Sequence, residues 1–296
     1  MKYRNFLVVA TFAVGSLTSF AQSNLLNAKV PSEIGKKTAA QLSNDDDKPL
    51  AYGYVHDRDV LMGKTTWEII DLDERINFPL YYPIDTANIG KERRSLYDVL
   101  TKAMKDGKLT EVYTDSYFNT KKTLKDIQAS LSRIDTTDAG REQINAGIPI
   151  DPQYIVKTDL GAIDVSDYKI KGYWYFDKRQ SELKYRLLGL CPVTPDVFTV
   201  GKDEQDYIEL FWVYFPAVRD ILHDAKSFND RNSAQPISFD HLLNSRRFNG
   251  VIYKEENVYG DREIAEYMKE NSQMQLLESE RVKDKIRDFE QDMWNY

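Results

Sequence analysis

Residues 170–190 read IKGYWYFDKRQSELKYRLLGL, and this stretch decides the fold because two strand-forming runs flank a short charged turn. The first run is Ile170 to Phe176 and the second is Leu183 to Leu190. Both are dense in aromatic and branched residues, which favour β-strands. A third run of the same kind extends from Tyr207 to Phe215. We expect these three runs to form a central sheet.

Around this sheet the sequence predicts a mixture of strands and helices. Strands are expected at 67–71, 109–113 and 251–253. Helices are expected at 91–106, from a cap at Asn119 or Thr120 through Ile134, at 217–226 and at 239–247. The order has no regular βαβ repeat. We therefore expect an α+β fold with a mixed, mainly antiparallel sheet, flanking helices and a long C-terminal helix.

The chain divides into four predicted parts. Residues 1–21 are a signal peptide, and residues 22–56 are a polar, flexible leader that contains the acidic run Asn44-Asp45-Asp46-Asp47. Residues 57–260 form the α+β core, with glycines and prolines indicating a loop or hinge at 135–152. Residues 261–296 contain no proline or glycine and form a helical tail.

The amino terminus indicates export. Lys2 and Arg4 precede an apolar stretch that is too short and too interrupted to span a bilayer. The stretch closes with Ser19-Phe20-Ala21, so cleavage is expected before Gln22. The single cysteine, Cys191, is far from this point, so a membrane would be contacted only through partners.

Composition argues against some classes of binding partner and against stabilisation by an internal disulfide. The full chain has a net charge of −7, which argues against nucleic acid and against direct binding to anionic lipid. One cysteine cannot form an internal disulfide, so stability depends on a packed core. Cys191 is expected to be a small buried hydrophobe.

The tail helix places Val282, Ile286, Phe289 and Met293 at steps of four, three and four residues, with charges between them. Two interpretations stay open. The apolar stripe docks on the chain's own core, or it contacts a partner subunit. We take these four residues as candidate partner contacts.

No pattern of catalytic, cofactor-binding or metal-binding residues stands out. His56, His223 and His241 belong to no metal-binding pair, and there is no nucleophile elbow or phosphate loop. We expect no enzyme activity and no cofactor. Two alternatives remain. Asp71, Asp73 and Glu74 would serve a cell-wall hydrolase, and exposed aromatic residues at 173–176 would serve a peptidoglycan-binding module.

Several long motifs carry a family resemblance. They are Ile70–Asn77 with Tyr81-Tyr82-Pro83, Trp174–Leu183 with Tyr185–Gly189, Phe211–Pro216 with Arg219, Phe239-Asp240, Arg247-Phe248, and Tyr253–Tyr259. Together they resemble the gliding motility protein family GldN, called PorN in non-gliding relatives. The resemblance covers about residues 57–268.

The resemblance implies a function that the residues alone do not give. Proteins of this family are exported, non-catalytic components of the type IX secretion system and of gliding motility. The resemblance implies a location in the periplasm, peripherally associated with the outer membrane. The implied partners are an outer-membrane lipoprotein of the GldK or PorK kind and other copies of the chain, with which it forms a ring. The periplasmic part of the inner-membrane motor GldL/GldM is a further implied partner. The family offers no catalytic residues to transfer to this sequence.

Overall fold

The computed structural model describes residues 48–85, 94–149, 151–200, 202, 205–228, 237–269 and 271–294. The chain divides into two units, residues 1–48 and residues 49–296. The second unit carries the elements described below. The predicted signal peptide and the acidic run of the leader lie outside the described residues, so both stay predictions.

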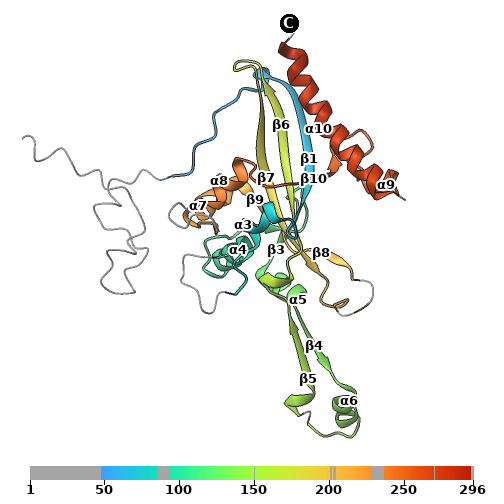
Figure 1. Ribbon diagram of the computed structural model, residues 1–296. Helices are drawn as coiled ribbons and strands as arrows, with labels where there is room; N and C mark the ends of the chain where they lie inside the picture. Colours follow the sequence, from blue (N-terminus) through green and yellow to red (C-terminus); the bar gives the residue numbers. More distant parts are fainter. Residues whose placement is uncertain are drawn as a thin grey trace, which may run out of the picture. The chain divides into compact units, whose positions relative to one another are not determined.

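A six-stranded sheet in the described part of the chain has the order β10-β1-β6-β7-β8, with β9 paired to β7 (Figure 1). Every pairing in it is antiparallel. The bounds are β1 (Val60–Asp71), β6 (Asp167–Asp177), β7 (Glu182–Pro195), β8 (Tyr207–Glu209), β9 (Val213–Tyr214) and β10 (Val251–Glu255). The predicted α+β class, the antiparallel sheet and the two strands of the 170–190 stretch are confirmed.

Helices and two small hairpins complete the described elements. The helices are α3 (Phe78–Tyr81), α4 (Leu96–Lys105), α5 (Leu124–Leu131), α6 (Asp138–Asn145), α7 (Phe215–Asp224), α8 (Phe239–Asn244), α9 (Ile264–Tyr267) and α10 (Ser272–Trp294). The hairpins are β2 (Val112–Tyr113) with β3 (Lys121–Lys122), and β4 (Ser132–Thr136) with β5 (Ile155–Asp159). Single 3₁₀ turns lie at Asp57–Asp59, Arg75–Asn77, Pro152–Tyr154 and Ala162–Asp164.

One face of the sheet carries the main core. Successive residues of a strand point to opposite faces, so Tyr168 and Ile170 of β6 share a face that Lys169 and Lys171 do not. Tyr168 and Ile170 are buried in one hydrophobic cluster with residues from five of the described helices, α3, α4, α5, α7 and α8. The helix residues of this cluster include Leu96 and Leu100 of α4, Val218 and Leu222 of α7, and Leu242 and Leu243 of α8.

The opposite face carries a smaller aromatic cluster of Trp67, Cys191 and Trp212. The Lys171 ammonium lies 5.0 Å from the centre of the Trp67 ring, and the Lys254 ammonium lies 4.8 Å from it. Both are cation–π distances. Burial raises the pKa of the Cys191 thiol. The prediction that Cys191 is a small buried residue is confirmed by its position in this cluster.

An ion pair crosses from the end of α8 to the middle of β1. The Arg246 Nη2 donates to Glu68 Oε2 at 2.7 Å, and the Glu68 side chain is only 1 % exposed. The Arg246 guanidinium also lies 4.2 Å from the Tyr185 ring centre and 5.0 Å from that of Trp174. Arg246 therefore links strands β1, β6 and β7 to the turn that follows α8.

Several predicted elements have different bounds in the structure. The helix expected from Asn119 or Thr120 through Ile134 begins after Thr123 and ends at Leu131. Thr123 is the cap because its hydroxyl accepts the Asp126 N–H at 3.4 Å while the Asp126 carboxylate accepts the Thr123 N–H at 3.1 Å. Ile134 then belongs to β4, where it pairs with Lys157.

The segment 135–152, which the sequence predicts as a loop or hinge, contains the end of β4, the helix α6 and a 3₁₀ turn. Thr137 starts α6 by accepting the Gly140 N–H through its hydroxyl. Motion about this segment stays a prediction.

The run Tyr207–Phe215 is not one strand. It divides into β8 and β9, and α7 begins at Phe215 with Pro216 in its first turn. Proline is favoured there because the first turn of a helix needs no intrahelical N–H donor.

The tail also differs from the sequence prediction, although the long C-terminal helix is confirmed. The helix expected from Asp261 onward is divided into α9 and α10. The side-chain oxygen of Asn271 accepts the N–H groups of Gln273 and Met274 at 3.0 and 3.2 Å, which starts a new helix at this point. None of the described helices is long and apolar enough to cross a membrane.

We predict that Glu68→Gln lowers the free energy of unfolding by about 3 kcal/mol, because it leaves the partly buried Arg246 without its counter-charge. Urea unfolding followed by circular dichroism measures the change. The matched control is Glu111→Gln, which removes an exposed partner of Lys121 and should leave the urea midpoint unchanged. Equal midpoints for both variants would show that the Glu68–Arg246 pair does not stabilise the fold.

Candidate functional site

The inner side of α10 packs on the sheet. Val282 and Ile286 form a buried cluster with Ile252 of β10, and Met62, Trp174 and Leu183 pack against that cluster. The Ser279 hydroxyl accepts the Ile252 N–H at 2.9 Å. The ring of Phe289 meets that of Phe176 edge to face at 5.8 Å. The tail helix is therefore docked on its own fold, which is the first of the two interpretations that the sequence left open.

The four candidate partner contacts lie on or near this docked side. Val282 and Ile286 are 1 % and 6 % exposed, and Phe289 and Met293 are half-buried. Val282 and Ile286 cannot reach a partner while α10 is docked. A partner contact by these four residues stays a prediction, and it would require either undocking of the helix or contact through Phe289 and Met293 at its end.

A different set of apolar residues faces solvent on the first turns of α10. Met274, Leu276 and Leu277 are 46 %, 52 % and 62 % exposed. Sequence reasoning missed them because it followed the regular spacing that begins at Val282. The run Met274-Gln275-Leu276-Leu277 could have indicated them. Its apolar residues are too close together in sequence to lie on one buried face of a helix, so some of them must face solvent.

Short-range polar contacts hold the start of α10 in place. The Tyr267 hydroxyl of α9 donates to Glu278 Oε1 at 3.2 Å, and Arg281 Nε donates to Glu278 Oε2 at 2.7 Å. The hydrogen bond from Arg281 lowers the pKa of Glu278. Burial raises the pKa of Tyr267 to about 12, with Glu278 adding to the effect. Tyr267 therefore stays a donor at neutral pH and fixes α9 against α10.

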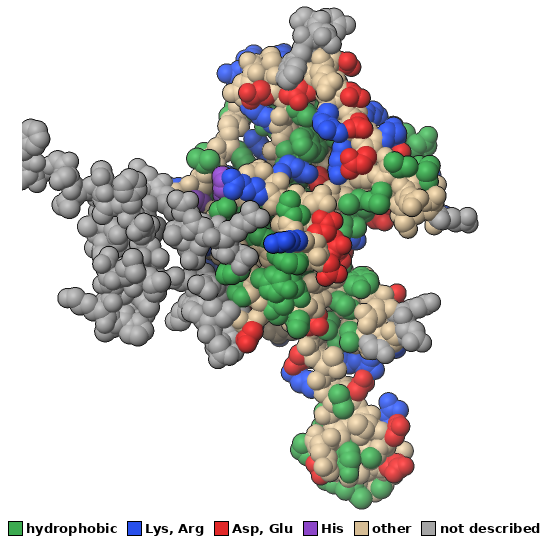
Figure 2. Space-filling view, viewed as in Figure 1, with side chains coloured by type: hydrophobic (Ala, Val, Ile, Leu, Met, Phe, Trp, Pro, Cys, Tyr) green, Lys and Arg blue, Asp and Glu red, His purple; other side chains and the backbone are tan. Residues whose placement is uncertain are grey.

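The β4–β5 hairpin and α6 carry a second exposed apolar surface. Within this part of the described chain, the exposed large apolar side chains are Ile134, Ile144, Ile148, Ile155 and Val156. Figure 2 shows hydrophobic side chains interspersed with charged ones over this hairpin, at the bottom of the view. A two-stranded hairpin is marginally stable by itself in water, so such a surface is suited to contact with another molecule.

The residues considered for chemistry have structural roles. Asp71 Oδ1 accepts the Asp73 N–H at 2.8 Å, and Glu74 Oε2 accepts an N–H of the Asn249 side chain at 2.7 Å, so this acidic group organises a turn. The aromatic run at 173–176 lies in β6. Tyr175 and Phe176 are buried, which disfavours an exposed glycan platform.

The histidines are distributed over three places. His56 precedes a 3₁₀ turn and meets the Tyr54 ring, His223 lies in the last turn of α7, and His241 lies in α8. Among the described residues, no group of three or more His, Cys, Asp or Glu side chains could hold a metal ion.

An α+β protein with exposed apolar residues on two separate elements is suited to contact other macromolecules. A family model described as gliding motility associated protein GldN matches residues 55–295. The chain therefore belongs to the GldN family, and the resemblance seen in the sequence is confirmed. No curated protein matches the chain.

We predict that Ile286→Ala loosens α10, because truncating a buried isoleucine costs about 2–5 kcal/mol. Hydrogen exchange of residues 272–294 should become faster, whereas exchange in β6 should change less. Leu277→Ala, in the exposed part of the same helix, is the control and should leave exchange unchanged. Equal exchange in both variants would mean that Ile286 does not hold the tail on the sheet.

Proposed function

We propose that this protein is a non-catalytic, periplasmic structural subunit of the type IX secretion and gliding machinery. It assembles in a ring with other copies and with an outer-membrane lipoprotein of the GldK/PorK kind. It supports the secretion of surface adhesins and enzymes. The observation that carries this proposal is the match to a gliding-motility-associated family over residues 55–295.

The amino terminus supports the proposed location. The signal peptide expected at residues 1–21 would export the chain, and no cysteine follows its cleavage site to accept a lipid. Attachment to the outer membrane then depends on a lipoprotein partner. The periplasmic part of the GldL/GldM motor is a further partner through which force would reach the ring.

The exposed apolar surfaces support the proposed assembly role. Leu276 and Leu277 on α10 and the isoleucines of the β4–β5 hairpin lie on different elements of one chain. A subunit in a ring has neighbours on more than one side, and large exposed apolar side chains favour such contacts. We assign the α10 surface to the lipoprotein and the hairpin to the next copy.

Deleting the gene should abolish both secretion through the type IX system and spreading on agar. The culture supernatant is compared by mass spectrometry with that of the parent strain, and the chain expressed from a plasmid is the control for restoration. Normal secretion by the deletion strain would contradict the proposal.

The chain carrying an affinity tag should be recovered from native envelopes together with an outer-membrane lipoprotein in stoichiometric amount. The double variant Leu276→Gln/Leu277→Gln should lose the lipoprotein while keeping the urea midpoint of the parent, because both side chains are exposed. A tagged chain recovered alone would count against the assembly. Full recovery by the double variant would refute only the α10 assignment.

A further inference from the structure

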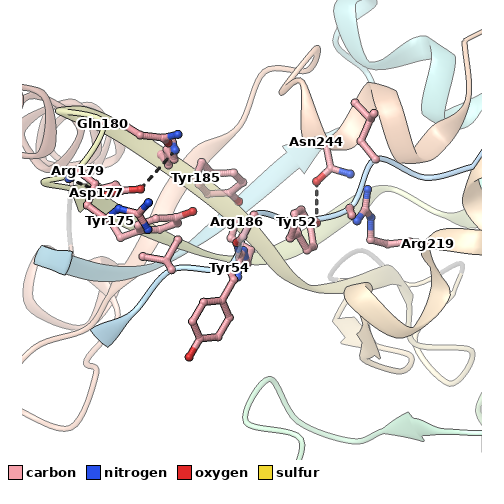
Figure 3. Close-up of a pocket in the computed structure, with 15 residues that line it drawn as sticks. Tyr52, Tyr54, Tyr175, Asp177, Arg179, Gln180, Tyr185, Arg186, Arg219 and Asn244 are labelled. Atoms are coloured by element: carbon pink, nitrogen blue, oxygen red, sulfur yellow. Dashed lines mark hydrogen bonds and ion pairs between the residues drawn. The ribbon is translucent and has the colours of Figure 1, made fainter. Parts of the chain in front are cut away.

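A pocket lies between the segment that precedes β1 and the outer part of the β6–β7 hairpin. We call residues 49–56 the strap. The strap forms one wall of the pocket, whose volume is about 440 Å³. Figure 3 shows Arg186 in its middle, with Tyr52, Arg219 and Asn244 at one end and Tyr175, Asp177 and Arg179 at the other. This volume is in the range of ligand pockets and far exceeds that of a single small ion.

Tyr52 anchors the strap. Its ring centre lies 4.1 Å from the Arg219 guanidinium carbon and 4.6 Å from that of Arg186. Its hydroxyl donates to Asn244 Oδ1 at 2.8 Å. Burial raises the pKa of Tyr52, so the hydroxyl keeps its proton at neutral pH. The strap does not pair with β7 as a strand, because the described residues of β7 before Gly189 pair only with β6. The side-chain contacts of Tyr52 therefore hold the strap in place.

The pocket is cationic in a chain whose net charge is −7. Among the described residues that line it, the charged side chains are Arg179, Lys184, Arg186 and Arg219 on one hand and Asp177 on the other. Asp240 neutralises Arg219 through a hydrogen bond at 2.8 Å. The Lys184 ammonium lies 3.5 Å from Asp177 and 3.8 Å from Glu182, distances longer than a normal hydrogen bond, so its N–H groups are available to a further carboxylate. Arg179 lies 3.9 Å from Asp59.

Arg186 differs from these three. Within the described part of the chain, its contacts are the Gly53 carbonyl, to which Nη2 donates at 3.2 Å, and the rings of Tyr52 and Tyr175. None of these carries a negative charge. A guanidinium that contacts no carboxylate is suited to bind one from outside, since its planar N–H groups match a carboxylate in pairs.

The spacing of the cations indicates the form of the ligand. Lys184 and Arg186 are two residues apart in β7, so their side chains lie on the same face, about 7 Å apart along the strand. Every second side chain of an extended peptide repeats at the same distance. Two carboxylates at alternate positions of such a peptide therefore match Lys184 and Arg186.

We propose that this pocket binds an extended acidic peptide segment, with carboxylates at alternate positions received by Arg186 and Lys184 beside the strap. This ligand class goes beyond the proposed role in a ring and does not depend on it. The chain itself contains a segment of this composition, Asp45-Asp46-Asp47, whose sequence supplies a probe.

The test is a calorimetric titration of the mature chain in which Asp45, Asp46 and Asp47 are replaced by Asn, so that the chain's own acidic run cannot compete. The probe is the blocked peptide of residues 42–49, and the control peptide carries Asn at the three Asp positions. We expect 1:1 binding of the acidic peptide, roughly tenfold tighter than that of the control and weaker as salt is raised.

Two pocket variants and one remote variant locate the site. Arg186→Gln and Lys184→Gln should each weaken binding roughly tenfold or more. Arg141→Gln changes an exposed arginine on α6 and should leave binding unchanged. Circular dichroism melting checks that each variant is folded, and Lys184→Gln keeps the Tyr52 anchor intact in case Arg186→Gln releases the strap.

Three results would overturn the inference. The first is that the acidic and Asn peptides bind equally, or that neither binds. The second is that both pocket variants bind the acidic peptide as tightly as the parent chain does. The third is that inorganic phosphate displaces the peptide at a comparable concentration. The last result would identify the pocket as a site for small anions.

Discussion

The Glu68 carboxylate is only 1 % exposed, so the structure around it depends on the ion pair with Arg246 that balances its charge. Taking two charges out of water costs several kcal/mol for each ion, so such a pair persists only where other contacts compensate. Here the compensation comes from the rings of Tyr185, Trp174 and Phe248, which surround the guanidinium. Phe248 belongs to the main core, whereas Trp174 packs against the cluster under α10. Arg246 therefore contacts aromatic rings that belong to, or pack against, both hydrophobic clusters.

The two faces of the sheet use different physical chemistry. The face with Tyr168 and Ile170 carries the largest hydrophobic cluster of the described chain and is covered by helices, so it supplies most of the hydrophobic stabilisation. The other face stacks lysine ammonium groups on Trp67, an arrangement that keeps charge near the surface while covering an aromatic core. Burial lowers the pKa of Lys171. The ammonium also donates to the Ser116 carbonyl at 3.0 Å, which holds the loop between β2 and β3 over this face.

Strand composition predicted the central hairpin of the sheet, because aromatic and branched residues at 170–190 have no other favourable environment. The elements that sequence reasoning misplaced are those decided by single local contacts. Ile134 fits a helical spacing, yet pairing with β5 places it in a strand. Likewise, the Asn271 side chain divides the tail into two helices. The candidate site was predicted less well. The apolar spacing in the tail identified the docked side of α10, and the exposed Leu276 and Leu277 have no periodic signal. The strap and Arg186 come together only in the folded chain, and no spacing rule connects them.

The order of the strands has a consequence for how the chain folds as it is made. β1 comes first, yet its two neighbours in the sheet are β6 and β10, and Glu68 pairs with Ile252 near the other end of the chain. Contacts of such high sequence separation slow folding. A chain that emerges from a ribosome amino terminus first therefore carries β1 with both edges unpaired until most of the sequence has followed. Unpaired edges of this kind recruit other strands. The segment 60–71 is thus open to pairing with other strands until β6 and β10 have been made.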